Sequence, residues 1–161
     1  MRANLVGQRS PNPLLGPVVA STVFTIDQLA KTGAPHLRSA LVAPARNPDY
    51  AFGAVGGSAL ALILGSLIVL AVFLAVIGTL ASRVGVSAAL PALIAGGMLG
   101  NTFDRINYGS VRDFLVIPGG IINLADVAVA AGVISLIVAL AIRSTRPAAI
   151  QLSAPGNRRI N

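Results

Sequence analysis

The 161-residue chain is 55% hydrophobic and 11% charged, with a mean hydropathy of +0.80, a balance that excludes a water-soluble globular protein and indicates one membrane domain of about four spanning helices. Its net charge of +7 comes from twelve basic residues against five acidic ones, and the basic residues fall mainly in the tails and short connections, which is typical of topogenic charge rather than of nucleic-acid binding. The absence of cysteine excludes disulfides, thiolate metal sites and a cysteine nucleophile, and a single histidine with no glutamate excludes an HExxH zinc site.

The first half of the chain predicts two membrane helices separated by a polar loop. Residues 1–13 are polar and basic and predict a cytoplasmic tail. Residues 14–30 form the first apolar segment; a cleaved signal peptide is the alternative, but the run continues into charged residues rather than into a small-residue cleavage site. Residues 31–57 are too polar to span a membrane and predict a small extracytoplasmic loop subdomain. Residues 58–81 carry no charge and form the clearest transmembrane helix.

The second half predicts two more membrane helices. Residues 86–103 form the third, in which Gly96 and Gly100 allow a neighbouring helix to approach closely. A loop of mixed character follows, and residues 121–142 form the fourth helix. The basic segment 143–161 predicts a disordered cytoplasmic tail.

The distribution of charge gives this bundle an orientation. Seven basic residues fall in segments assigned to the cytoplasm (Arg2, Arg9, Arg83, Arg143, Arg146, Arg158 and Arg159), and five fall in the outer loops or at the outer helix ends (Lys31, Arg38, Arg46, Arg105 and Arg112). We therefore expect an all-α integral membrane protein with a four-helix transmembrane domain over residues 14–142. Both termini are expected in the cytoplasm and the functional face outside.

Four aspartates lie at the outer level of this predicted bundle: Asp27, Asp104, Asp113 and Asp126. A charged side chain at membrane depth costs at least ~2.5–3.5 kcal/mol, so these residues indicate a functional site. Asn101 precedes Asp104 by three positions, and Asn123 precedes Asp126 in the same way. Because residues three apart share a helix face, each asparagine is expected to lie beside its aspartate. Asp126 is expected about five residues inside its helix, roughly 8 Å below the start.

Paired carboxylates in such a place predict general acid and base chemistry. Two carboxylates that share a site cannot both ionise cheaply, so the pair keeps a proton near neutral pH. An aspartic peptidase uses this arrangement: the ionised member takes a proton from water, while the protonated member polarises the scissile carbonyl. No metal, cofactor or covalent intermediate is required. This reasoning leaves open whether Asp104 or Asp113 is the partner of Asp126.

Five short elements, in chain order, carry a resemblance to a known family. They are Asp27-Gln28-Leu29-Ala30-Lys31, Asn47 with Ala51-Phe52-Gly53, Gly100-Asn101-Thr102-Phe103-Asp104-Arg105, Val111-Arg112-Asp113-Phe114 and Asn123-Leu124-Ala125-Asp126. One such element alone is weak evidence. Together they make the chain resemble the lipoprotein signal peptidases, also called signal peptidase II, from about residue 14 to residue 142.

The resemblance implies that Asp113 and Asp126 are the catalytic dyad. It also implies supporting or substrate-binding roles for Asn101, Asp104, Arg105, Asn123, Asp27, Lys31 and Asn47. The implied substrate is a bacterial prolipoprotein, cut just before its diacylglyceryl-modified cysteine at the extracytoplasmic face of the cytoplasmic membrane. We expect the protein to work as a monomer in contact with membrane lipid.

Two non-catalytic alternatives remain open. The family has small residues after the loop asparagine, whereas Pro48, Asp49 and Tyr50 follow Asn47 here, which favours a degenerate relative that binds precursors without cutting them. A proton-coupled carrier is the other alternative. Such carriers normally show internal repeats or broken helices in matching halves, and the chain shows no repeat beyond the two Asn-x-x-Asp elements.

Overall fold

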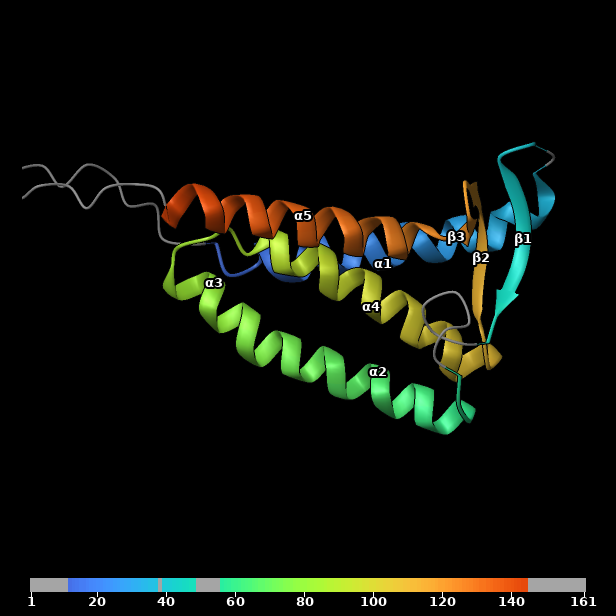
Figure 1. Ribbon diagram of the computed structural model, residues 1–161, viewed down its shortest axis with the longest axis horizontal. Coiled ribbons are helices and arrows are strands. Elements are labelled where there is room, and N and C mark those ends of the chain that lie inside the picture. The colour runs from blue at the N-terminus through green and yellow to red at the C-terminus, as the bar shows by residue number, and fades with distance from the viewer. Residues whose placement is uncertain (1–11, 38, 49–55, 145–161) are drawn as a thin grey trace, which may run out of the picture.

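The computed structural model describes residues 12–37, 39–48 and 56–144. Helices make up most of it: α1 (Leu15–Gly33), η1 (Ala34–His36), α2 (Ala59–Phe73), η3 (Leu74–Gly78), α3 (Thr79–Arg83), α4 (Ala89–Tyr108) and α5 (Leu124–Ser144). The segments α2, η3 and α3 follow one another without a break, and the middle of this run is π-helical. Three strands, β1 (Val42–Asn47), β2 (Val111–Ile117) and β3 (Gly120–Ile122), form a sheet at one end of the helices (Figure 1).

The sheet corrects the expectation of an all-α protein. Its order is β1-β2-β3 with both neighbouring pairs antiparallel, and Asn47 pairs with Val111. Because β1 and β2 come from loops far apart in sequence, their pairing leaves no local signal. The turn between β2 and β3 is Pro118-Gly119, and the φ of 94° at Gly119 is the positive value that a turn with proline at its second position and glycine at its third requires.

Helix α4 lies at the centre of the bundle because three of its glycines let other helices come close. A Cβ atom on Gly96 would lie 2.6 Å from the Ala20 carbonyl oxygen of α1, and one on Gly100 would lie 2.6 Å from Oδ2 of Asp27. On the other side, a Cβ on Gly97 would collide with the Ala125 carbonyl oxygen of α5. The expected close approach at Gly96 and Gly100 is therefore present, with α1 as the partner.

Two helix ends differ from the expected positions in ways that matter for the site. Helix α4 continues past residue 103 to Tyr108 and ends at Gly109, whose φ of 69° terminates it. Helix α5 begins at Leu124 because Ile121 and Ile122 pair in β3. Asp126 therefore lies in the first turn of α5 rather than about five residues inside the helix.

The outer surfaces of α2 and α5 are apolar. Leu60, Ile68, Ile134 and Ile137 are each at least 60% exposed, which suits contact with lipid rather than water. Within the described residues, the runs Ala59–Arg83 and Leu124–Ser144 are long and apolar enough to cross a membrane, with mean hydropathies of 3.1 and 2.4. The structure is thus mostly helical with lipid-compatible helices.

Candidate active site

Asp113 and Asp126 meet at a single buried residue, Asn123. The Asn123 side chain donates from Nδ2 to Oδ1 of Asp113 at 2.6 Å. Its Oδ1 accepts the backbone N–H of Asp126 at 3.0 Å, and its own backbone N–H donates to Oδ2 of Asp126 at 3.2 Å. Asn123 is 0% exposed, so the group that links the two carboxylates is shielded from water.

Local folding explains this meeting point. The reciprocal bonds between Asn123 and Asp126 form a capping box at the start of α5, in which each residue satisfies a backbone N–H that the helix leaves without a partner. The β2–β3 hairpin sets Leu115 opposite Ile122, which brings Asp113, two positions before Leu115, beside the residue that follows Ile122. The expected contact between Asn123 and Asp126 is thus present as a helix cap.

Asp113 lies in a setting that favours its protonated form. The side chain is buried on β2, and this burial raises the pKa of Asp113 above the usual aspartate value, with the nearby charge of Asp126 acting in the same direction. Hydrogen bonds from Asn123 and Asn47 oppose the rise without cancelling it. Asp113 therefore holds its proton to a higher pH than an ordinary aspartate.

Asp104 lies in a different environment, between two cations. Its carboxylate is 3.2 Å from Nζ of Lys31 and 2.9 Å from Nη2 of Arg112, and it also accepts the Arg112 backbone N–H at 2.9 Å. The side chain is completely buried. These contacts suit a carboxylate that holds other groups in place.

The first Asn-x-x-Asp element connects differently from the second. Asn101 accepts Nζ of Lys31 on Oδ1 at 2.9 Å and donates from Nδ2 to Oδ1 of Asp126 at 2.8 Å. Its side chain thus joins α1 to α5, whereas Asp104 faces Lys31 and Arg112. Arg105, which is buried beside them, donates to the backbone carbonyl of Asn101.

Asp27 anchors the start of α5 from another helix. Its Oδ1 accepts the backbone N–H of Ala125 at 2.8 Å, and its Oδ2 lies 2.8 Å from Nζ of Lys31. Both side chains are completely buried. Helix α1 therefore caps α5 through Asp27, which fixes the turn that carries Asp126.

All nine residues predicted for the site belong to this one hydrogen-bonded cluster. Sequence reasoning missed two further members, Gln28 and Arg112, which lie inside the quoted elements. Gln28 donates to Asp27 at 3.1 Å, and Nη2 of Arg112 donates to Oε1 of Gln28 at 2.6 Å. Arg112 was counted only as a loop charge; its position beside Asp113 in the same element was the available signal.

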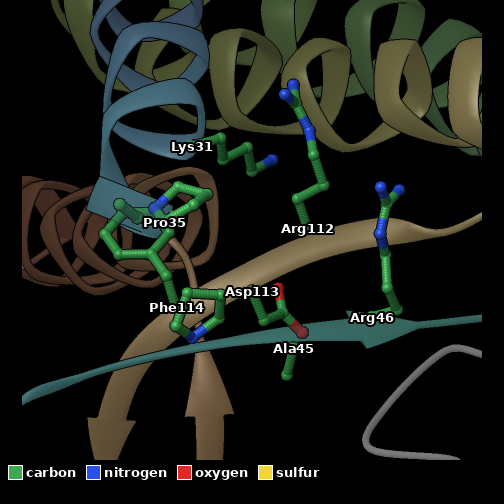
Figure 2. Close-up of a pocket in the computed structure, with 9 residues that line it drawn as sticks. Lys31, Pro35, Ala45, Arg46, Arg112, Asp113 and Phe114 are labelled. Carbon is green, nitrogen blue, oxygen red and sulfur yellow. The ribbon is translucent and has the colours of Figure 1, made fainter. Parts of the chain in front are cut away.

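Beside Asp113 is a pocket of about 190 Å³. Figure 2 shows Asp113 and Ala45 together, with Lys31 and Arg112 above them. The lining residues come from the end of α1, η1, β1 and β2: Lys31, Ala34, Pro35, Pro44, Ala45, Arg46, Arg112, Asp113 and Phe114. The pocket thus reaches one carboxyl of the pair.

Some of the predictions from the sequence concern residues that lie outside the described part of the chain. Asn47 ends β1 and hydrogen-bonds Asp113, but Asp49, Tyr50 and the Ala51-Phe52-Gly53 element are not among the residues described. The same holds for the tail segments 1–11 and 145–161. Among the described residues, no group of three or more His, Cys, Asp or Glu side chains is placed to hold a metal ion.

Comparison with known proteins adds a family and a fold. The family model described as "Signal peptidase (SPase) II" matches residues 19–142. A lipoprotein signal peptidase of Nitrobacter hamburgensis is 38% identical over 87 residues, covering 48% of this chain and 50% of that protein. One of Syntrophus aciditrophicus is 36% identical over 103 residues, covering 58% and 64%. The matched part thus spans about half to two thirds of these relatives' length.

Solved structures share the fold. One described as a bacterial membrane enzyme, solved by the in meso method at 2.3 Å resolution, has a TM-score of 0.71 and 23% identity, covering 85% of this chain and 93% of that one. Another, at 1.9 Å, has a TM-score of 0.69 and 22% identity, covering 83% and 97%. At these identities the likeness concerns the fold alone.

Proposed function

Because this chain belongs to the signal peptidase II family, we propose that it is a membrane aspartic endopeptidase that removes signal peptides from diacylglyceryl-modified prolipoproteins. The cut falls just before the lipidated cysteine. The observation that carries the proposal is the junction of Asp113 and Asp126 at Asn123. Two carboxyl groups that both hydrogen-bond to one buried asparagine can serve as the general acid and the general base that peptide hydrolysis needs.

The reaction on this pair proceeds without a covalent intermediate. The ionised carboxylate takes a proton from water as the water oxygen bonds to the scissile carbonyl carbon, and the protonated carboxyl gives its proton to the carbonyl oxygen. When the tetrahedral intermediate collapses, the C–N bond breaks, the leaving amine takes the proton first removed from water, and a hydroxyl of the intermediate returns its proton to the carboxylate that had protonated the carbonyl oxygen. The new carboxyl product and the amine then depart, and the dyad again holds one proton.

The remaining site residues hold this pair in place. Buried Asp27, Lys31 and Asp104 form a chain of alternating charges with the partly exposed Arg112, and Asn101 links that chain to Asp126. Asn47 and the pocket beside Asp113 lie where a substrate backbone would pass. Arg105 supports Asn101 through its carbonyl group.

We further propose that α1, the α2–α3 run, α4 and α5 all cross the bacterial cytoplasmic membrane. The sheet lies at one end of the bundle, whereas α3 and the end of α5 lie at the other (Figure 1). Arg83 and Arg143 are in the last turns of these two helices. Positive charge favours the cytoplasmic side, which supports cytoplasmic termini and an extracytoplasmic active site. In this arrangement the enzyme acts as a monomer on precursors within the lipid bilayer.

The first prediction tests the dyad. Asp113→Asn and Asp126→Asn should each lower the cleavage rate of a diacylglyceryl-modified precursor by about 10²- to 10⁴-fold, since each removes one proton-transfer group. The rate is measured with purified protein in lipid, with the unlipidated precursor as substrate control. Asn107→Ala, an exposed change near the end of α4, is the matched control and should leave the rate unchanged. Near-normal turnover in either aspartate variant would remove that residue from the dyad.

The atypical residues after Asn47 favour one second candidate, a relative that binds lipidated precursors without cutting them. In that case the wild-type protein would retain precursor in a pull-down but release no signal peptide over long incubation. Product formation that depends on both aspartates would exclude this candidate.

A further inference from the structure

Two arginines are paired with each other across strands β1 and β2. Arg46 and Arg112 are opposite one another in the antiparallel register, so their side chains lie on the same face of the sheet, and Figure 2 shows both extending in the same direction. Like charges directly opposite each other destabilise a sheet. Such a pair is therefore expected to have an anion nearby, supplied either by the protein or by a ligand.

The protein supplies an anion for one of the two arginines. Nη2 of Arg112 donates to Oδ1 of Asp104 at 2.9 Å and to Oε1 of Gln28 at 2.6 Å. Arg46 is exposed, and the ion pairs among the residues that the structure describes do not include it. Its positive charge is therefore available to a group from outside the protein.

One aromatic ring brings the two guanidinium groups together. Tyr108 is the last residue of α4, and the centroid of its ring is 4.3 Å from Cζ of Arg112 and 5.6 Å from Cζ of Arg46. Both distances are within the range of cation–π contacts. Such contacts position a cation without neutralising its charge. The planar guanidinium group of Arg46 is thus held in place and still suits a carboxylate, to which it can donate two parallel N–H groups.

The position of Arg46 relates it to the proposed dyad. Arg46 and Arg112 both line the pocket that reaches Asp113. In the register of the sheet Asp113 is opposite Ala45, and Arg46 is the next residue of β1. Because a strand advances about 3.3 Å per residue, a substrate side chain that contacts Arg46 belongs to a residue within about three positions of the bond that is cut.

The proposed substrate has polar residues on one side of that bond. A signal segment is apolar and suits the lipid-exposed helices, whereas the residues after the lipidated cysteine leave the membrane at the end that carries the sheet. We propose that Arg46, with Arg112 beside it, binds an acidic side chain among the first three residues after that cysteine. This preference rests on the proposed peptidase function and adds to it a class of favoured substrates, precursors with Asp or Glu at one of these positions.

Arg46→Gln tests the proposal without breaking an ion pair of the fold, which a substitution of Arg112 would do. Three pairs of diacylglyceryl-modified precursors are compared in phosphatidylcholine vesicles, with Asp or Asn at the first, second or third position after the cysteine. With the wild-type protein, kcat/KM should be about two- to fivefold higher for the Asp member of at least one pair, the range of an exposed ion pair. In Arg46→Gln this ratio should fall to about one.

Two further variants show whether the charge of Arg46 is responsible. Arg83→Gln removes the same charge from the exposed end of α3 and should keep the wild-type ratio. Arg46→Lys keeps the charge and should retain a ratio above one. A wild-type ratio near one for all three pairs would overturn the proposal, as would a ratio that Arg46→Gln leaves unchanged or that Arg46→Lys lowers as far as Arg46→Gln does.

Vesicles that contain phosphatidylglycerol distinguish the acidic side chain from a lipid phosphate. If Arg46 bound a lipid headgroup, Arg46→Gln would lower turnover in these vesicles only, and equally for the Asp and Asn precursors. That result would overturn the proposal.

Binding of the same precursors to the Asp126→Asn variant gives a readout that does not require turnover. The Asp precursor should bind about two- to fivefold more tightly than the Asn precursor, and the added change Arg46→Gln should remove the difference. Such a difference together with no cleavage by the wild-type protein would support the binding site and count against the proposed function. Equal binding of the two precursors would overturn the binding site alone, so the two failures are distinguishable.

Discussion

Three aspartates in one cluster differ because of the groups that each of them contacts. Asp104 is held by two cations, Lys31 and Arg112, and Asp126 receives an amide and a backbone N–H. Asp113 is buried with neutral amide donors beside it. Residue type and membrane depth left Asp104 and Asp113 equivalent as partners of Asp126; the contacts favour Asp113.

The raised pKa of Asp113 predicts a pH effect of substitution at Asn47, at the end of β1. The hydrogen bond from Asn47 stabilises the charged form of Asp113 and so lowers its pKa. Asn47→Ala removes that bond, so the pKa should rise further and the dyad should keep its proton to higher pH. The alkaline limb of the kcat/KM profile, which belongs to the coupled pair, should therefore move upward. Asn107→Ala again serves as the same-residue control, and a downward shift in Asn47→Ala would contradict the argument.

Among the elements, α4 determines how closely the bundle packs around the site. Gly96 and Gly100 face α1, and Gly97 faces α5, so the side chains of Asn101 and Asp104 on the same helix are brought against both neighbours. The absence of a side chain at these positions is therefore a condition for the buried ion pairs between α1 and α4.

A methyl group at Gly100 tests that condition. Its Cβ would lie 2.6 Å from Oδ2 of Asp27, so Gly100→Ala should push α1 outward and lower the free energy of unfolding by about 1–3 kcal/mol. Gly65→Ala in α2 is the matched control, because no atom lies within 4 Å of its added Cβ. The free energy of unfolding of this control should rise by up to about 1 kcal/mol, because alanine reduces the conformational entropy of the unfolded chain. Thermal unfolding in detergent measures both, and equal stabilities would contradict the packing argument.

Elements with a long apolar pattern could be predicted from sequence, whereas those made by distant pairing could not. Residues 58–81 predicted a helix because no charged residue interrupts them, and the observed helical segment extends over Ala59–Arg83. The strand Val42–Asn47 gave no such signal, since its hydrogen bonds are made with β2. The aspartates and asparagines of the site were indicated by their residue types, but the route from Lys31 through Asn101 to Asp126 depends on three helices meeting.

At the scale of the whole molecule, the two ends of the bundle differ in character. One end carries the sheet (Figure 1), whose strand β2 holds Asp113. At the other end, the Arg143 guanidinium donates to the carbonyl oxygens of Val84 and Gly85 and ties the connection between α3 and α4 to the end of α5. This polarity is what a protein with a fixed orientation in a membrane requires.

The orientation can be tested by cysteine labelling. The chain contains no cysteine, so a single introduced cysteine is the one thiol in the protein that a maleimide can label. Ser39→Cys lies at the sheet end and Ser82→Cys near the opposite end; both positions are exposed. In intact spheroplasts a membrane-impermeant maleimide should label the Ser39→Cys variant and leave the Ser82→Cys variant unlabelled until the membrane is opened. The reverse labelling would place the site on the cytoplasmic side.

The contact between Asp27 and Lys31 also bears on the order in which the chain enters the membrane. Asp27 caps the last helix through Ala125, which emerges from the ribosome long after α1. During that interval the partner available within α1 is Lys31, four residues away at 2.8 Å in the folded protein, and such a pair offsets the two charges within one helix. Pulse labelling should therefore show slower early membrane integration for Lys31→Met but normal early integration for Asp104→Asn, which leaves this pair intact. The ion pair that holds the finished site together would then also stabilise α1 in the lipid bilayer until α5 has been synthesised.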